Sequence, residues 1–499
     1  MANPAMLTRA VRRPLSRWAL TSISSSQTKR GAAVLAGLQS TPMDDGSHGQ
    51  QQLVHNPFAS HYHPVATPML WRDEFWRRVP VFKDVSAGEF ISYRWSIKNT
   101  VETSAKLYGF LKAVVPDEVP YDEEGTRTQA KEDFILDIFD GVKSSTMSIR
   151  ITPYVLSRIN WQDPRNDPVF RQFIPLKSMF LPDHPKLTLD SLHETADSPA
   201  PGLVHRYPDK ALFLATSVCP TYCTYCTRAH TVGADTETVS KKSQKPSRKR
   251  WDEVFAYIES QPQLQDIVIS GGDSYYLQPD HIRLIGERLI GIPHIRRFRY
   301  ASKGLAVAPG RLVDAQDGWA DALIDISQKA KAAGKSMALH THFNHPNEIS
   351  WVTKMAAQRL HEAGVTVRNQ SVLLRGINDN VETLSTLIRK LADNNILPYY
   401  VYICDMVKMN EHRRTTLQTM LDLEAQIRGS IAGFMMPQFV VDLPGGGGKR
   451  LASTYESYDR ETGVSRFVAP AVTATKAMGR GREKPEVFEY YDPIGPARE

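Results

Sequence analysis

The stretch "ALFLATSVCPTYCTYCTR", residues 211–228, joins a short apolar run to a cysteine-rich loop. Residues 211–216 have the pattern of a buried β-strand. Cys219, Cys223 and Cys226 follow at once, and the chain of 499 residues has only one other cysteine, Cys404. In α/β proteins, ligands bind beyond the carboxyl ends of the strands. The stretch therefore predicts a ligand site at the end of a strand.

Downstream of this stretch, short β-rich runs alternate with amphipathic segments. Strands separated by helices of this length form βαβ units and a parallel sheet. Six units predict an α/β fold, an open or partial (β/α)6 barrel. The predicted strands are 211–216, 266–270, 296–302, 336–342, 366–373 and 397–403, and the predicted helices are 251–260, 279–290, 318–333, 350–363, 381–393 and 412–428.

The chain upstream of the barrel differs in composition. Six of the seven net positive charges come from Arg and Lys residues within residues 1–43, which contain no acid. Such an Arg- and Ser-rich segment predicts a mitochondrial transit peptide and hence the mitochondrial matrix, with a disordered basic tail of a cytoplasmic protein as the alternative. The expected organisation is a transit peptide 1–43, a linker 44–68, a helical N-terminal region 69–204, the barrel 205–435 and a C-terminal extension 436–499.

Composition also excludes some classes of protein. The basic run "SKKSQKPSRKR" (240–250) lacks aromatic residues, so we interpret it as a solvated loop and expect no nucleic-acid partner. No apolar stretch is long enough for a transmembrane helix, so no membrane partner is expected. Four cysteines do not make a disulfide framework, which favours a reducing compartment.

The cysteine spacing C-x3-C-x2-C leaves two interpretations open. A structural zinc site needs four ligands, and His230 could supply the fourth. A cubane iron–sulfur cluster held by only three thiolates would leave one iron open to a small molecule. The spacing favours the open cluster but does not exclude zinc.

These motifs resemble the radical S-adenosylmethionine superfamily. The resemblance implies that Cys219, Cys223 and Cys226 hold a [4Fe–4S] cluster whose fourth iron is chelated by S-adenosylmethionine. The segment "SGGD" after the second strand resembles the superfamily motif that meets the methionine amino group. The residues implied near S-adenosylmethionine are Ser270, Gly271, Gly272, Asp273, and His342 and Gln370 at strand ends. Alone, each is more typical of a turn or a core position.

A narrower resemblance is to lysine 2,3-aminomutases. The segments "HRYPDK", "THFNHPNEI", "NQSVLLRGIND", "PYYVYICD" and "FVVDLPGGGGK" occur here in that order. The family implies pyridoxal 5′-phosphate bound through a Schiff base to Lys449, the catalytic lysine after four glycines. It also implies cofactor contacts from Arg206, Lys210 and Tyr402. By itself, "GGGGK" would indicate a flexible surface turn.

The same resemblance assigns the substrate. Arg228 would pair with the carboxylate of L-lysine, and Asp405 and Asp442 would hold the side-chain ammonium. Two carboxylates would repel glutamate. The alternative is that both aspartates lie in surface ion pairs or cap helices. The expected reaction converts L-lysine to β-lysine by 2,3-amino migration through a 5′-deoxyadenosyl radical.

The resemblance also implies an electron donor for the cluster and a homo-oligomer. The cysteine-rich C-terminal segment of many relatives is absent, and Asn380 stands where they have a cysteine, so no structural zinc is predicted. Two alternatives remain. One is a related radical enzyme acting on another amino acid or on a lysine destined for or attached to a protein. The other is a non-catalytic iron–sulfur or zinc-binding module.

Overall fold

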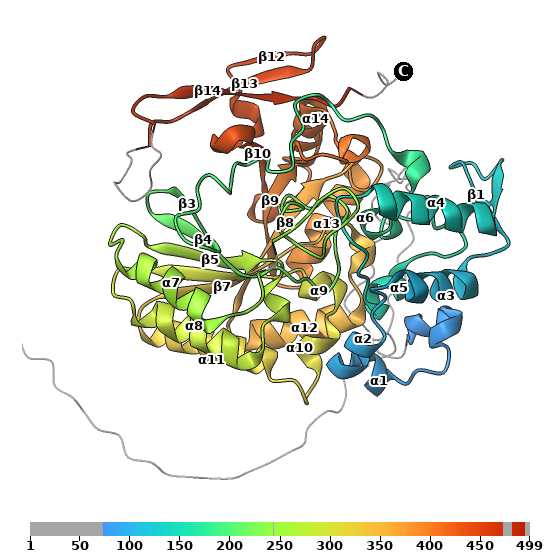
Figure 1. The fold of residues 1–499 in the computed structure, drawn as a ribbon, viewed down its shortest axis with the longest axis horizontal. Coiled ribbons are helices and arrows are strands. Elements are labelled where there is room, and N and C mark those ends of the chain that lie inside the picture. The colour runs from blue at the N-terminus through green and yellow to red at the C-terminus, as the bar shows by residue number, and fades with distance from the viewer. Residues whose placement is uncertain (1–72, 243, 473–481, 495–499) are drawn as a thin grey trace, which may run out of the picture. The chain divides into compact units, whose positions relative to one another are not determined.

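The structure is a computed structural model that describes residues 73–242, 244–472 and 482–494 (Figure 1). The segments interpreted as a transit peptide (1–43) and a linker (44–68) lie outside the described residues. All described residues belong to one compact unit, 66–499. Within the described part of the chain, no helix is long and apolar enough to cross a membrane.

The central element is a curled nine-stranded sheet in the order β11-β10-β9-β8-β7-β6-β5-β4-β3 (Figure 1). Strands β4 to β10 run parallel, and β3 and β11 add antiparallel edges. The strands are β3 (Leu203–Tyr207), β4 (Lys210–Thr216), β5 (Asp266–Gly271), β6 (Arg297–Ala301), β7 (Ser336–Thr341), β8 (Thr366–Leu373), β9 (Ile396–Ile403), β10 (Gln438–Leu443) and β11 (Gly448–Leu451).

Helices connect the parallel strands, and α7, α8 and α11 lie along the outside of the sheet in Figure 1. Their amphipathic character explains this placement. In α13, Leu384, Leu387, Ile388 and Leu391 form one buried stripe, and the Asn380 side chain caps the first turn. The connecting helices are α7 (Arg248–Glu259), α8 (Pro279–Gly291), α9 (Gly304–Val307), α10 (Gly310–Val313), α11 (Trp319–Ala332), α12 (Trp351–Glu362), α13 (Val381–Asp393) and α14 (Leu417–Ile427).

The chain forms two further regions, one before and one after the nine-stranded sheet in sequence. The N-terminal one is mainly helical, with α1 (Ala87–Ile91), α2 (Tyr93–Lys98), α3 (Ser104–Val114), α4 (Lys131–Ser144), α5 (Pro153–Arg158), α6 (Phe170–Phe173) and a hairpin of β1 (Glu118–Pro120) and β2 (Thr128–Ala130). The C-terminal one is a three-stranded antiparallel sheet of β12 (Ser457–Asp459), β13 (Val464–Ala469) and β14 (Glu486–Tyr491).

The structure confirms the α/β partial barrel, and all six predicted strands and helices are present. It also extends the sheet: β10 is a seventh parallel strand, and β10 and β11 lie within the segment expected to be an extension. The interpretation of 240–250 as a solvated loop is wrong for Lys241. Its side chain is buried, and its ammonium donates to the carbonyl of Val232 at 2.8 Å.

Candidate active site

One cavity of about 420 Å³ brings together the candidate cluster, cofactor and substrate residues named from the sequence, and only His230, the candidate fourth zinc ligand, is not part of its lining. Each of the nine strands of the sheet, or the loop that follows it, contributes to the lining. The candidates on its wall are Arg206, Lys210, Cys219, Cys223, Cys226, Arg228, Ser270, Gly271, Gly272, Asp273, His342, Gln370, Tyr402, Asp405, Asp442 and Lys449. Cys404 is fully buried and is not part of this wall.

The three cysteines lie on the loop after β4 and are partly buried free thiols. Burial, with Asp273 and the neighbouring thiols, raises the pKa of Cys219 well above its usual value, and burial raises the pKa of Cys223 to about 11. Three adjacent thiols in such surroundings ionise together only if a bound cation compensates their charge.

The donor set fits a cluster better than a single ion. No group of three or more His, Cys, Asp or Glu side chains among the described residues is arranged to hold one metal ion. Nε2 of His230 lies 3.9 Å from Asp190, and His230 does not line the cavity that holds the three cysteines, so its placement does not favour the alternative Cys3His zinc site. A cubane cluster takes each thiolate on a different iron, so three thiols spaced around one cavity wall suit it.

The glycine pair at the end of β5 has a packing role. Gly271 has φ +112°, and a Cβ there would lie 2.1 Å from the carbonyl oxygen of Thr216. At Gly272 a Cβ would lie 2.5 Å from the carbonyl oxygen of Val218. The backbone of the cysteine loop therefore presses directly against the glycines. Asp273 is buried, and its carboxylate accepts from the amides of Tyr275 and Lys303.

His342 and Gln370 are linked in one network. His342 follows β7, and its Nε2 lies 3.0 Å from the hydroxyl of Tyr225, a residue between the cysteines. Gln370 does not end its strand as expected but lies inside β8, with its amide 3.1 Å from Nδ1 of His340. Burial and nearby cations lower the pKa of both histidines to about 3, so both are neutral at pH 7.

Lys449 and Asp442 are cross-strand neighbours in the β10–β11 hairpin. The Lys449 ammonium lies 2.5 Å from Oδ2 of Asp442 and 5.5 Å from the centre of the Tyr402 ring. Burial opposes the charge of Lys449, but Asp442 outweighs it and raises the lysine pKa well above its usual value. Oδ1 of Asp442 is buried and has no hydrogen-bond partner within the described part of the chain. This oxygen can accept from a ligand.

The turn that carries Lys449 is closely packed, so it is not a free surface loop. Gly445, Gly446 and Gly448 all have positive φ, which favours glycine. A Cβ at Gly447 would lie 2.7 Å from Phe488, and one at Gly448 would lie 2.9 Å from the hydroxyl of Tyr207.

Asp405 differs from Asp442 in its partners. Its carboxylate accepts from the hydroxyl of Thr227 at 2.5 Å, and no ion pair to it occurs among the described residues. Burial and the neighbouring Asp442 raise the pKa of Asp405 to about 7. On the other side of Lys449, burial together with Lys449 and Arg299 lowers the pKa of Lys210 to about 7. The site thus holds a carboxylate and an amine that each lack an ion-pair partner in the described chain.

Both candidate arginines are held by acids that sequence reasoning missed. Arg228 makes two 2.8 Å hydrogen bonds to the carboxylate of Glu194, and Arg206 donates to Asp197 at 2.9 Å. Both acids lie in the irregular segment before β3, which shows no periodicity that could have revealed them. Tyr225 and Thr227 could have been found from their place beside the cysteines.

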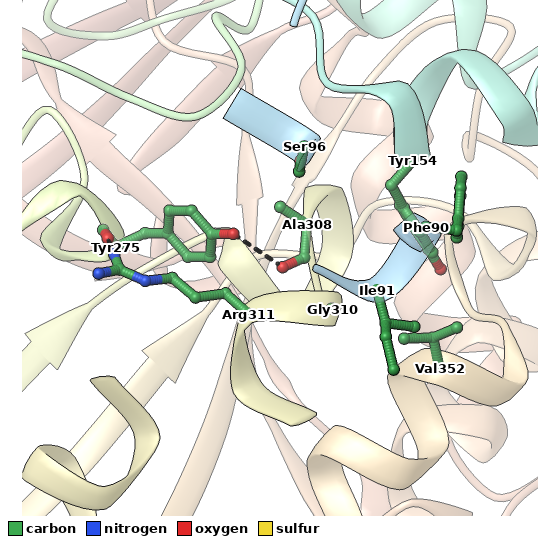
Figure 2. A pocket seen from close by; sticks show the side chains of 9 residues that line it. All are labelled: Phe90, Ile91, Ser96, Tyr154, Tyr275, Ala308, Gly310, Arg311 and Val352. Atoms are coloured by element: carbon green, nitrogen blue, oxygen red, sulfur yellow. Dashed lines mark hydrogen bonds between the residues drawn. The ribbon is translucent and has the colours of Figure 1, made fainter. Parts of the chain in front are cut away.

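A second cavity, shown in Figure 2, has only about 10 Å³. It lies beside α1 and α10, where the hydroxyl of Tyr275 donates to the carbonyl of Ala308 at 3.1 Å. Its volume is at the limit for one water molecule. It is a packing gap and no candidate site.

Comparisons of the sequence with known proteins identify several relatives of the chain. The chain is 36% identical over 375 residues to the L-lysine 2,3-aminomutase of Clostridium subterminale, which covers 75% of this chain and 80% of the relative. It is 35% identical over 374 residues to the L-lysine 2,3-aminomutase of Bacillus subtilis (75% and 71%). It is 27% identical over 366 residues to the glutamate 2,3-aminomutase of Clostridioides difficile (72% and 75%). No model of a protein family matches the chain.

Proposed function

We propose that this chain, which belongs to the lysine 2,3-aminomutase family, is a radical S-adenosylmethionine isomerase that converts L-lysine to β-lysine. One observation carries the proposal. The cysteines, the glycine pair, Lys449, Arg228 and the two aspartates Asp405 and Asp442 all line the same cavity.

The cysteine side of the cavity would hold the [4Fe–4S] cluster and S-adenosylmethionine. When bound, these groups supply one electron and a carbon radical that removes hydrogen from the substrate. Cys219, Cys223 and Cys226 would provide the thiolates. Ser270, Gly271, Gly272, Asp273, His342 and Gln370 would surround S-adenosylmethionine. His342 is neutral and therefore adds no charge there.

The hairpin side would hold pyridoxal 5′-phosphate, which supplies a conjugated ring that stabilises the migrating amino group. Lys449 would bind its carbonyl carbon, with Tyr402 beside the lysine. Arg206 and Lys210 would bind the phosphate: Arg206 is a cation, and a bound phosphate would favour the charged form of Lys210. Lys210 keeps the charge but cannot bind two phosphate oxygens in the manner of an arginine.

The substrate would lie between Arg228 and the two aspartates. Arg228 would orient the carboxylate, while Asp405 and the unpartnered Oδ1 of Asp442 would accept from the side-chain ammonium. A glutamate substrate would place its side-chain carboxylate beside these two acids, which is unfavourable. The relative named glutamate 2,3-aminomutase nevertheless makes another amino acid the principal alternative.

The remaining parts of the proposal concern partners. Turnover needs a one-electron donor for the cluster, and we propose a homo-oligomer from family membership. The basic segment 1–43 would direct the chain to the mitochondrial matrix. A fusion of these residues to a fluorescent protein tests this: mitochondrial fluorescence would support it, and diffuse cytoplasmic fluorescence would contradict it.

The decisive experiment is an anaerobic assay. The chain is reconstituted with iron, sulfide and pyridoxal 5′-phosphate, then given reductant, S-adenosylmethionine and L-lysine. Derivatised products are analysed by mass spectrometry. β-Lysine that depends on every component would support the proposal. Release of 5′-deoxyadenosine without β-lysine would reject lysine and direct the assay to glutamate and to protein-borne lysine. A colourless protein that binds no iron would reject the radical chemistry.

A further inference from the structure

Four cationic side chains surround the cysteine loop, and three of them have an acid of their own. Arg228 pairs with Glu194 at 2.8 Å, and Lys303 pairs with Glu348 at 2.9 Å. Arg150, whose carbonyl accepts from the amide of Tyr222 in the loop, pairs with Glu102 at 2.7 Å. Each of these pairs contributes little net charge.

Lys241 is the fourth cation, and it differs from the others. It comes from the segment after the cysteine loop, and its side chain is only 8% exposed. Its ammonium donates to the carbonyl of Val232 at 2.8 Å and lies 3.6 Å from the sulfur of Met147. Both partners are neutral, and within the described chain no carboxylate lies within ion-pair distance of this ammonium. The carboxylate of Asp235 is nearby but accepts from the Lys241 backbone amide.

The place of Lys241 next to the cysteines follows from packing. Met147, Tyr222, Ala229 and Val232 form one buried cluster, and Cys219 and Cys226 pack against it. The segment is also fastened to the start of the loop, because the amide of Ser217 donates to Gln244 and its hydroxyl accepts from Gln244. The ammonium is therefore held at the cysteine loop rather than in solvent.

We propose that the buried ammonium of Lys241 stabilises the reduced state of the iron–sulfur cluster held by the three cysteines. Lys241 would act on the cluster through its charge and would not be a ligand. This inference rests on the proposed function. Three thiolates give a cubane cluster a net negative charge, and one electron from an external donor makes it more negative. A buried cation that has no ion pair of its own stabilises the more negative state most. The reduction potential of such a cluster depends on nearby charge.

The electrostatics of Lys241 agree with this role. Burial lowers its pKa, which is the cost of an ammonium taken from water, whereas Cys226, Asp235 and Cys219 oppose that shift. A cluster bound by these cysteines would place further negative charge beside the ammonium. The segment after the cysteine loop thus supplies the cluster with a positive charge. Without the negative charge of the cluster, burial of this ammonium would be unfavourable.

The test is a redox titration of the reconstituted holoenzyme, followed by electron paramagnetic resonance of the reduced cluster. Lys241→Met removes the charge and keeps much of the shape, and Lys242→Met removes the same charge from an exposed neighbour. At the midpoint potential of the wild type, we expect the ratio of reduced to oxidised cluster in Lys241→Met to be at least threefold lower. This corresponds to a midpoint potential that is lower by about 28 mV. Lys242→Met and Lys241→Arg should titrate like the wild type.

Each other outcome has a defined meaning. Equal potentials for Lys241→Met and wild type would overturn the inference. If Lys241→Met loses the cluster but Lys241→Arg keeps it, as iron and sulfide content would show, the need for a cation is supported. If both lose it, the residue serves packing and the inference fails. A wild-type protein that assembles no cluster would instead overturn the proposed function.

Discussion

Asp405 and Asp442 lie close together, yet the charged groups around the two carboxylates differ. Lys449, Arg206 and Lys210 overcome the burial of Asp442 and lower its pKa, whereas burial and Asp442 raise that of Asp405 to about 7. Asp442 is therefore ionised across the neutral range. Asp405 binds a proton below about pH 7 and loses it above, so of the two aspartates only Asp405 makes ammonium binding sensitive to pH near neutrality.

This difference predicts how lysine binding depends on pH. As the pH falls from 8 to 6, Asp405 gains its proton and loses its attraction for the substrate ammonium, so KM for lysine should rise about tenfold. Asp405→Asn should have a high KM at both pH values and no such dependence. Initial rates measured anaerobically at several lysine concentrations test this. An unchanged pH profile in Asp405→Asn would assign the titration to another group, such as Lys210.

The second prediction concerns Glu194. Its two hydrogen bonds fix the plane of the Arg228 guanidinium, which we propose binds the substrate carboxylate. Glu194→Ala should raise KM for lysine about tenfold, because it leaves a partly buried guanidinium unrestrained. Glu194→Gln keeps one acceptor and should have a smaller effect.

Iron content and pyridoxal absorption should stay at wild-type levels in both Glu194 variants, which separates a local effect from misfolding. A lower KM in either variant would contradict this prediction. It would mean that Glu194 competes with the substrate carboxylate for Arg228.

At the scale of elements, the repeating units could be predicted from the sequence because each has a local signal. The run 366–373 is β8 itself, and 381–393 is α13 itself. The helix expected at 412–428 begins later, at Leu417, because residues 411–413 form a separate 3-10 turn and Thr416 caps the helix. β3 was missed because "LVHRY" is short and ends in charged and polar residues.

Sequence reasoning also left the C-terminal strand β14 unassigned. It pairs with β13, and it and the residues after it contact a loop far away in the chain. The hydroxyl of Tyr490 donates to the carbonyl of Cys404 at 3.0 Å, next to Asp405. The amide of Ile494 donates to Glu411, which forms a fully buried ion pair with Arg414. The strand therefore fastens the loop that carries Asp405.

Tyr490→Phe tests this function of the C-terminal strand. The change leaves a buried carbonyl without its donor, so the free energy of unfolding should fall by about 1–3 kcal/mol. KM for lysine should rise because Asp405 is less well fixed. Urea unfolding and steady-state rates measure the two effects. Tyr108→Phe, on an exposed ring, is the matched control and should change neither. Wild-type stability in Tyr490→Phe would contradict the role.

At the scale of the whole molecule, the sequence identified which residues meet but not how they pair. Motifs separated by more than two hundred residues line one cavity because parallel strands bring their carboxyl ends to one edge, and the antiparallel edge strands β3 and β11 add Arg206 and Lys449 to the same wall. The pairs Arg228–Glu194 and Arg206–Asp197, and the burial of Lys241, arise from irregular segments. Such segments have no periodicity, so their contacts depend on tertiary packing alone.

The two halves of the cavity should respond independently to their cofactors. The cysteines follow β4 near one edge of the sheet, and Lys449 lies on β11 at the other edge. A ligand that binds only the folded chain at one hundred times its Kd adds about 2.7 kcal/mol to stability. Anaerobic reconstitution with iron and sulfide, and separately with pyridoxal 5′-phosphate, should therefore each raise the Tm, and the two increments should nearly add.

Cys223→Ala should lose only the increment from iron and sulfide, and Lys449→Ala only that from pyridoxal 5′-phosphate. Scanning fluorimetry of the four loading states measures this. Loss of both increments in either variant would show that the two sites fold as one unit, and would contradict independent binding at the two edges.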